Sequence, residues 1–230
     1  MNLTWRDRAD GKLEIDLSPS TPTDVNPPVR TLLIDSPVDR LTGDRMAVAA
    51  CLAFGRYFRG SVRVQTGVSP RLAGALTAYG APSWVGVFPV EDTAVGQGGT
   101  GTTFLLDLEN RGWAGRPPLS TGRVVSLDIV RSDRCAGRLF TTDRLVVASN
   151  AWLLDDGQSD TRGLSPMLAV ALLLGGDLAV SRVVVPHTRA PNPQWEDRVS
   201  RLLSSVGVQV TFCPVAAADH LEDATGGSSS

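Results

Sequence analysis

The chain has 230 residues, of which 42% are hydrophobic and 20% are charged. This length and balance suit a globular protein with a sizeable core and argue against disorder. The formal net charge of −2 argues against nucleic acid as an obligatory partner, because such binding depends on neutralising phosphates. Lys12 is the only lysine, so any mechanism that needs a lysine has this one alone available.

The cysteines and the longest apolar run indicate a cytoplasmic protein with no membrane partner. Cys51, Cys135 and Cys213 are widely spaced and lack CxxC spacing, which is typical of reduced thiols rather than of a disulfide framework or a zinc site. The charged N-terminal segment has no apolar stretch behind it, so no signal peptide is predicted. The run at 167–174 is far shorter than the roughly 20 residues of a membrane span.

The first half of the chain alternates predicted strands and helices. Residues 13–17 alternate apolar and acidic side chains, which is typical of a strand with one buried face. Ser69 and Pro70 predict a helix start, and Gly80 predicts its end. The predicted strands are 13–17, 29–34, 61–64 and 84–90, and the predicted helices are 39–58 and 70–79.

The second half continues in the same way. The pattern predicts strands at 103–108, 124–130, 145–149, 183–185 and 208–212, helices beginning at Ser165 and Gln194, and loops at 96–101, 110–121 and 155–162. We therefore expect an α/β fold of repeated strand–helix units, with helices packed on mixed β-sheets. The expected organisation is an N-terminal strand and polar lead-in at 1–28, one domain at 29–218 and a flexible tail at 219–230.

Two segments, 67–90 and 163–186, suggest an internal repeat. Each begins with a glycine, carries a Ser-Pro pair before an Ala- and Leu-rich helix, and ends in a strand. The simpler alternative is that any capped helix of an α/β protein reads this way.

Two other motifs are interpreted as ordinary loops. The glycine-rich stretch 96–103 resembles a phosphate-binding loop, but Thr102 stands where the lysine is needed and a strand follows instead of a helix. Asp155, Asp156 and Asp160 could form a metal site, but solvated turn acids are the favoured interpretation.

His187 follows a strand end, where ligand sites of α/β proteins often lie, yet no nucleophile accompanies it.

The start of the helix near Asp39 offers a possible anion site. Arg40 and Arg45 could add positive charge to a helix N-terminus that already favours anions. From the residues alone, surface arginines beside a buried helix are the preferred interpretation.

The run 39–55 resembles the opening of the 5-enolpyruvylshikimate-3-phosphate synthases and other enolpyruvyl transferases. Arg40 falls on the family's lysine position and Arg45 on its arginine. Residues 75–80 resemble the family's second helix, and 168–171, 182–185 and 206–210 resemble its late helix and closing strands. Glu196 and Arg198 resemble its closing acidic–arginine motif.

This resemblance implies transfer of an enolpyruvyl group from phosphoenolpyruvate to a small hydroxylated phosphate substrate, with neither cofactor nor metal. It implies anion binding by Arg40, Arg45 and Arg198, and proton transfer by Asp160 and Glu196. The chain is about half the family's usual length, Leu41 replaces a small hydroxyl residue, and Gly163 stands at the catalytic aspartate position unless Asp160 shifts into it. The alternative is an inactive relative that acts as an interaction or ligand-binding subunit. The expected partner is a small anionic ligand or another protein subunit, including a second copy of the chain.

Overall fold

The computed structural model describes residues 1–21, 24–80, 84–92, 101–107, 122–134, 136–154, 164–187 and 192–214. Within these residues, eleven strands form one mixed sheet on which four α-helices pack. The predicted α/β class is therefore confirmed. No helix in this described part of the chain combines the length and apolar character needed to cross a membrane.

The first half of the sheet comes from residues 2–90. Its strands are β1 (Asn2–Asp7), β2 (Leu13–Ser18), β3 (Thr31–Ile34), β4 (Gly60–Val68) and β5 (Trp84–Val90). Its helices are α1 (Gly43–Phe54) and α2 (Pro70–Gly80), and a short 3-10 turn, η1 (Gly55–Tyr57), follows α1.

The second half comes from residues 102–214. Its strands are β6 (Thr102–Asp107), β7 (Val124–Arg131), β8 (Arg138–Phe140), β9 (Arg144–Ser149), β10 (Val180–His187) and β11 (Gln209–Pro214). Its helices are α3 (Leu164–Leu174) and α4 (Pro193–Ser204), and the 3-10 turn η2 (Ala151–Leu154) precedes α3.

The two halves share one order of connections. The first runs β5-β4-β1-β2-β3 and the second β11-β10-β6-β7-β9, and the single pair Ile34–Ser149 joins them. In each half a helix carries the chain back to a strand that pairs with the first strand of that half, and a second helix leads to the edge strand. Two differences remain. Strand β2 is antiparallel to its neighbours whereas β7 is parallel to both, and the second half has the additional strand β8 beside β9.

The matched peptides 67–90 and 163–186 do not occupy equivalent places in this arrangement. The first contains α2 and the second contains α3. The strand order instead equates α1 with α3 and α2 with α4.

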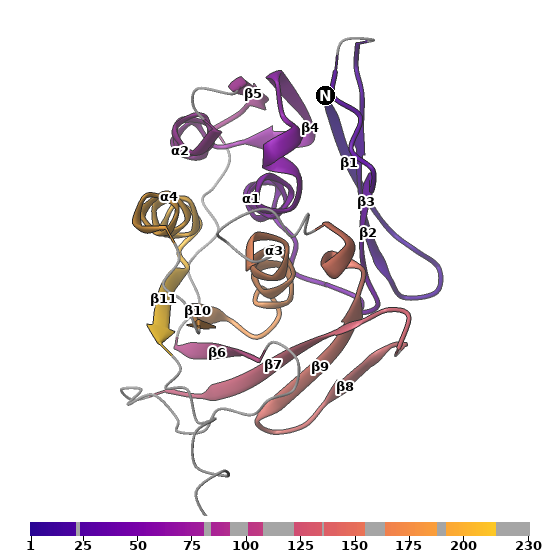
Figure 1. Ribbon diagram of the computed structural model, residues 1–230, viewed down its shortest axis with the longest axis vertical. Coiled ribbons are helices and arrows are strands. Elements are labelled where there is room, and N and C mark those ends of the chain that lie inside the picture. Colours follow the sequence, from indigo (N-terminus) through magenta and orange to yellow (C-terminus); the bar gives the residue numbers. More distant parts are fainter. Residues whose placement is uncertain are drawn as a thin grey trace, which may run out of the picture.

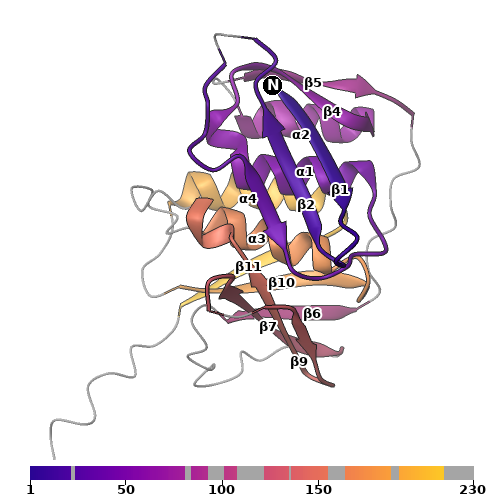
Figure 2. The ribbon, with the colours of Figure 1, turned by 90° about the vertical axis from the view of Figure 1, so that its right-hand side faces the viewer.

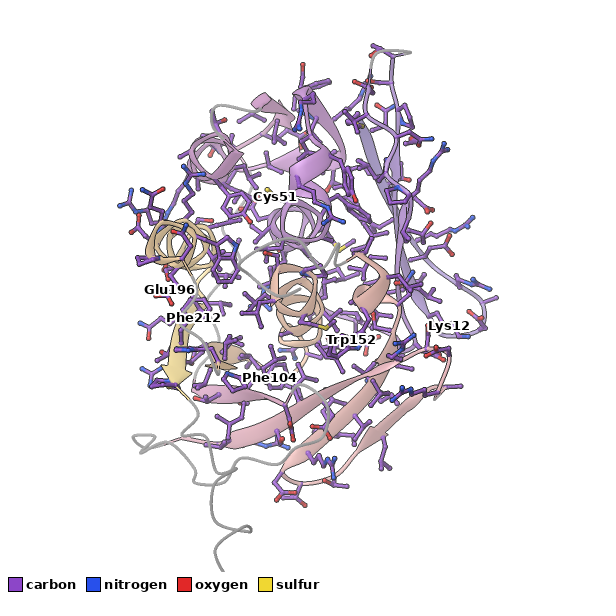
Figure 3. The ribbon with its side chains drawn as sticks, viewed as in Figure 1. Lys12, Cys51, Phe104, Trp152, Glu196 and Phe212 are labelled. Atoms are coloured by element: carbon purple, nitrogen blue, oxygen red, sulfur yellow. The ribbon has the colours of Figure 1, made fainter. Side chains whose placement is uncertain are left out.

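The sheet curves around α1 and α3, which pack against each other at its centre (Figure 1). Strands β1 and β2 cover one side of these helices (Figure 2). Helix α3 has apolar residues around nearly its whole circumference and is almost entirely buried, as expected for a central helix. Phe104 of β6 is fully buried beneath it (Figure 3). The core is therefore enclosed between the central helices and the concave face of the sheet.

Several local predictions differ from the structure, and three of them show why. Strand β1 was not predicted, and its formation depends on pairing with β2 and β4. Strand β8 lies between the predicted strands 124–130 and 145–149, where no element was predicted, and it pairs with β9. Helix α1 begins at Gly43 rather than at Asp39, because Thr42 caps it in an extended conformation (φ −114°, ψ 151°). These boundaries depend on partners that a local pattern does not contain.

Candidate functional site

The N-terminal end of α1 carries the best-defined polar arrangement around the predicted anion site. The Thr42 side chain accepts a hydrogen bond from the Arg45 backbone N–H at 3.2 Å. The segment that leads into the cap is held by Asp177, from the turn after α3. Its carboxylate accepts from the backbone N–H groups of Asp39 at 3.1 Å and Arg40 at 2.8 Å. The chain therefore supplies its own anion at this place.

Arg45 is buried at the junction of α1 and α3. Its Nη1 donates to the carbonyl oxygen of Leu172 at 3.3 Å, in the last turn of α3, where a cation is favoured. Burial lowers the pKa of Arg45, and the nearby charge of Asp177 opposes that shift. An arginine remains charged in proteins even so. Arg45 thus acts as a C-terminal cap of α3.

Gly176 allows this junction to close. A Cβ atom at this position would stand 2.7 Å from the Arg40 carbonyl oxygen and 3.4 Å from Nη1 of Arg45. The first of these distances is shorter than van der Waals contact permits. The loop can therefore approach α1 only with glycine here, while the Arg40 side chain remains exposed.

A second polar contact joins the starts of α1 and α2. Asp44 Oδ1 accepts from the Ser69 backbone N–H at 2.8 Å, and Oδ2 accepts from Ser69 Oγ at 2.7 Å. Both residues are buried. Ser69 Oγ in turn accepts from the Leu72 backbone N–H at 3.3 Å, as predicted for an N-cap. Asp44 was not predicted as a functional residue, although an acidic residue in the first turn of an apolar helix was a visible signal.

The other predicted residues lie on α4. Glu196 is half-buried in its first turn and Arg198 is exposed (Figure 3). Arg198 is close enough to Tyr79 for its charge to lower the pKa of that phenol, although burial is the larger effect and raises it. Helix α4 also contacts α3 directly, because Nε1 of Trp195 donates to Ser165 Oγ, in the first turn of α3, at 3.3 Å.

Arg45 and Arg198 are therefore not brought together. Arg45 contacts Leu172 near the end of α3, whereas α4, which carries Arg198, contacts Ser165 near the start of α3 through Trp195. Seven residues of helix separate these two contacts, which is about 10 Å along the axis. Asp160 lies outside the described residues, as do Asp155 and Asp156. The structure thus places the predicted cations at two ends of one helix.

The remaining candidates are His187, the glycine-rich loop and a metal site, and the described residues do not form a catalytic group around any of them. His187 ends β10 and is half-buried. Most of the glycine-rich loop lies outside the described residues, and the strand predicted after it is β6. In the ranges that the structure describes, no group of three or more His, Cys, Asp and Glu residues could hold a metal ion.

Two further buried carboxyl groups, Asp107 on β6 and Asp128 on β7, were also not predicted from the sequence. The available signal was a single acidic residue inside each of two otherwise largely apolar strands, since burying a charge is costly unless it is paired.

Comparisons of the chain with protein-family models, with curated proteins and with solved structures found no match in any of the three.

Proposed function

We propose that this protein is a non-catalytic chain that works as an interaction or ligand-binding subunit, with the resemblance to enolpyruvyl transferases retained as a hypothesis about its ancestry. The observation that carries this proposal is the carboxylate of Asp177 on the backbone N–H groups of Asp39 and Arg40. A transferase would need that region, beside the N-terminus of α1, to receive a phosphate or carboxylate group of its substrate.

The arginines support the same proposal. Arg45 is bound to the Leu172 carbonyl inside the fold, and its charge contributes to the stability of the α1–α3 junction. A substrate anion would have to compete with both this bond and Asp177. Transition-state stabilisation requires several cations around one site, and Arg198 lies on α4, which contacts the other end of α3 through Trp195 and Ser165.

Exposed apolar side chains on two strands favour an interaction role. Phe88 and Val90 on β5, and Leu139 and Phe140 on β8, are between 42% and 62% exposed. Strand β5 is an edge of the sheet, and β8 has only β9 as a partner among the described strands. Unpaired strand edges are common sites of association with another chain.

The test is a thermal-shift titration of wild-type protein with phosphoenolpyruvate and, separately, with inorganic phosphate. We expect no stabilisation of the wild type at millimolar ligand. Asp177→Ala frees the two N–H groups beside Arg45, so this variant should gain a phosphate-dependent shift. A ligand at ten times its Kd would add about 1.4 kcal/mol, or roughly 3 to 6 °C for a chain of this size.

Asp39→Ala is the matched control, because Asp39 is exposed and contributes only its backbone N–H to Asp177. It should respond to phosphate as the wild type does. Stabilisation of the wild type by phosphoenolpyruvate, abolished by Arg40→Ala, would contradict the blocked anion site on which the non-catalytic proposal depends.

That outcome would favour the second candidate function, an active enolpyruvyl transferase. The observation in its favour is that Arg40 and Arg45 do lie at the same N-terminal end of α1. In that case another subunit, or a second copy of the chain, would supply the missing cations.

A further inference from the structure

Asp107 and Asp128 form a buried acidic pair on adjacent parallel strands. They are direct partners in the register of β6 and β7, and the two strands lie about 4.8 Å apart. Phe104 and Leu106 of β6 point into the helix-facing core. Because side chains alternate along a strand, Asp107 and its partner Asp128 point to the opposite face of the sheet. Both are nevertheless buried, with exposures of 7% and 1%.

The two oxygens of Asp128 have different surroundings. Oδ2 accepts from Nε of Arg144 at 2.5 Å and also forms an ion pair with Nη2 of the same residue. Oδ1 is excluded from solvent and has no hydrogen-bond donor. A buried carboxylate oxygen without a donor is costly, so this atom indicates a missing proton or ligand.

The charged groups that face Asp128 come from both neighbouring strands. Strand β6 presents Asp107 and strand β9 presents Arg144, while Ser126 and Val130 are its nearest neighbours on the same face of β7. Burial raises the pKa of Asp128, and Arg144 opposes this rise. The nearby carboxylate of Asp107 adds to it.

We propose that Asp107 and Asp128 share one proton in the native state and form a pH-sensitive clasp between β6 and β7. The proton supplies the hydrogen bond that Oδ1 of Asp128 lacks, without a second negative charge at the pair. Two ionised carboxylates opposite each other on neighbouring strands would repel, more strongly in a buried setting. A divalent cation between them is disfavoured because the guanidinium of Arg144 already lies against Asp128.

The proton makes the stability of the fold depend on pH. An aspartate in the unfolded chain loses its proton near a pKa of about 3.9. The native pair keeps its proton above that value, so the native state binds more protons than the unfolded state does. The contribution of the clasp is therefore present at low pH and is lost as pH rises through the higher, native pKa.

The test compares wild type with Asp128→Asn, whose amide imitates the protonated carboxyl group. Urea unfolding is measured from about pH 4 to pH 8. Between the unfolded and the native pKa, the ratio of the variant's folding equilibrium constant to that of the wild type should rise by up to about tenfold per pH unit. Asp143→Asn, which removes an exposed carboxylate next to Arg144, should give a curve parallel to that of the wild type.

Carboxyl ¹³C NMR of the wild type tests the same claim without relying on a variant that must fold. One aspartate signal should remain protonated above the unfolded pKa. Its absence would overturn the proposal, and so would parallel pH profiles for wild type and Asp128→Asn. Stabilisation of the wild type by millimolar Ca²⁺ or Mg²⁺, lost in Asp128→Asn, would also overturn it and assign the site to a cation.

Discussion

Removing the carboxylate of Asp44 should destabilise the whole protein, because this group joins the starts of α1 and α2. Its two oxygens accept from the backbone and the hydroxyl of Ser69 at 2.8 and 2.7 Å, and both residues are buried. Asp44→Ala removes two hydrogen bonds to a charged group and leaves a buried N–H without a partner. Hydrogen bonds of this kind contribute about 1.5 to 3 kcal/mol each and are not additive, so we expect a loss of roughly 2 to 4 kcal/mol.

The assay is urea and thermal unfolding followed by circular dichroism. For a chain of this length the loss corresponds to a fall in Tm of roughly 5 to 15 °C. Asp44→Asn keeps an acceptor for the Ser69 N–H and should lose less. Asp39→Ala, which removes an exposed carboxylate from the preceding segment, should change the free energy of unfolding by no more than about 0.5 kcal/mol.

A double-mutant cycle with Ser69→Ala isolates the contact itself. The single change at Ser69 also removes the N-cap of α2, which contributes about 1 kcal/mol. Because the two residues are in contact, the double variant should cost less than the sum of the single variants, by at least about 0.5 kcal/mol. Equal free energies of unfolding for Asp44→Ala and Asp39→Ala would contradict this role of Asp44. Additive effects of Asp44→Ala and Ser69→Ala would contradict the contact between the two residues.

Further predictions concern backbone contacts, acid stability and thiol reactivity. Gly43→Ala should destabilise the protein by about 1 to 3 kcal/mol, because its Cβ would lie 2.6 Å from Thr66 Oγ1 and 2.7 Å from a backbone oxygen. Gly74→Ala, at an exposed site of α2 with free space, should instead raise the free energy of unfolding by up to about 1 kcal/mol. Equal free energies of urea unfolding for the two variants would contradict this. The backbone N–H groups of residues 20 and 21 hold the pKa of Asp24 far below its usual value, so its contribution is present above about pH 4 and is lost on acidification. Asp24→Asn should therefore flatten the fall in the urea midpoint below about pH 4, and an unchanged acid profile would count against this role. Burial raises the pKa of the Cys51 thiol, so iodoacetamide should label Cys213 before Cys51, as read by peptide mass spectrometry; early labelling of Cys51 would show that its site opens readily.

The α/β class and most of the elements follow from local patterns in the sequence. Helix α2 begins at Pro70 directly after its Ser69 cap and ends at Gly80, as predicted from capping preferences alone. Strand β5 has the predicted bounds, and β6 follows the glycine-rich loop as a strand. These signals are local because capping and side-chain alternation act within a few residues.

The roles of the polar side chains were decided by the tertiary structure. Arg45 was visible as a cation near a helix start, but its partner, Leu172, is 127 residues away. Asp177 was not a candidate at all, and it meets Arg40 across 137 residues. Asp107 and Asp128 become a pair only through the register of β6 and β7. By itself the sequence determined which segments are helices and strands and where charge occurs. Only folding decided which charges meet, because electrostatic and hydrogen-bonding interactions depend on distances that a linear pattern does not contain.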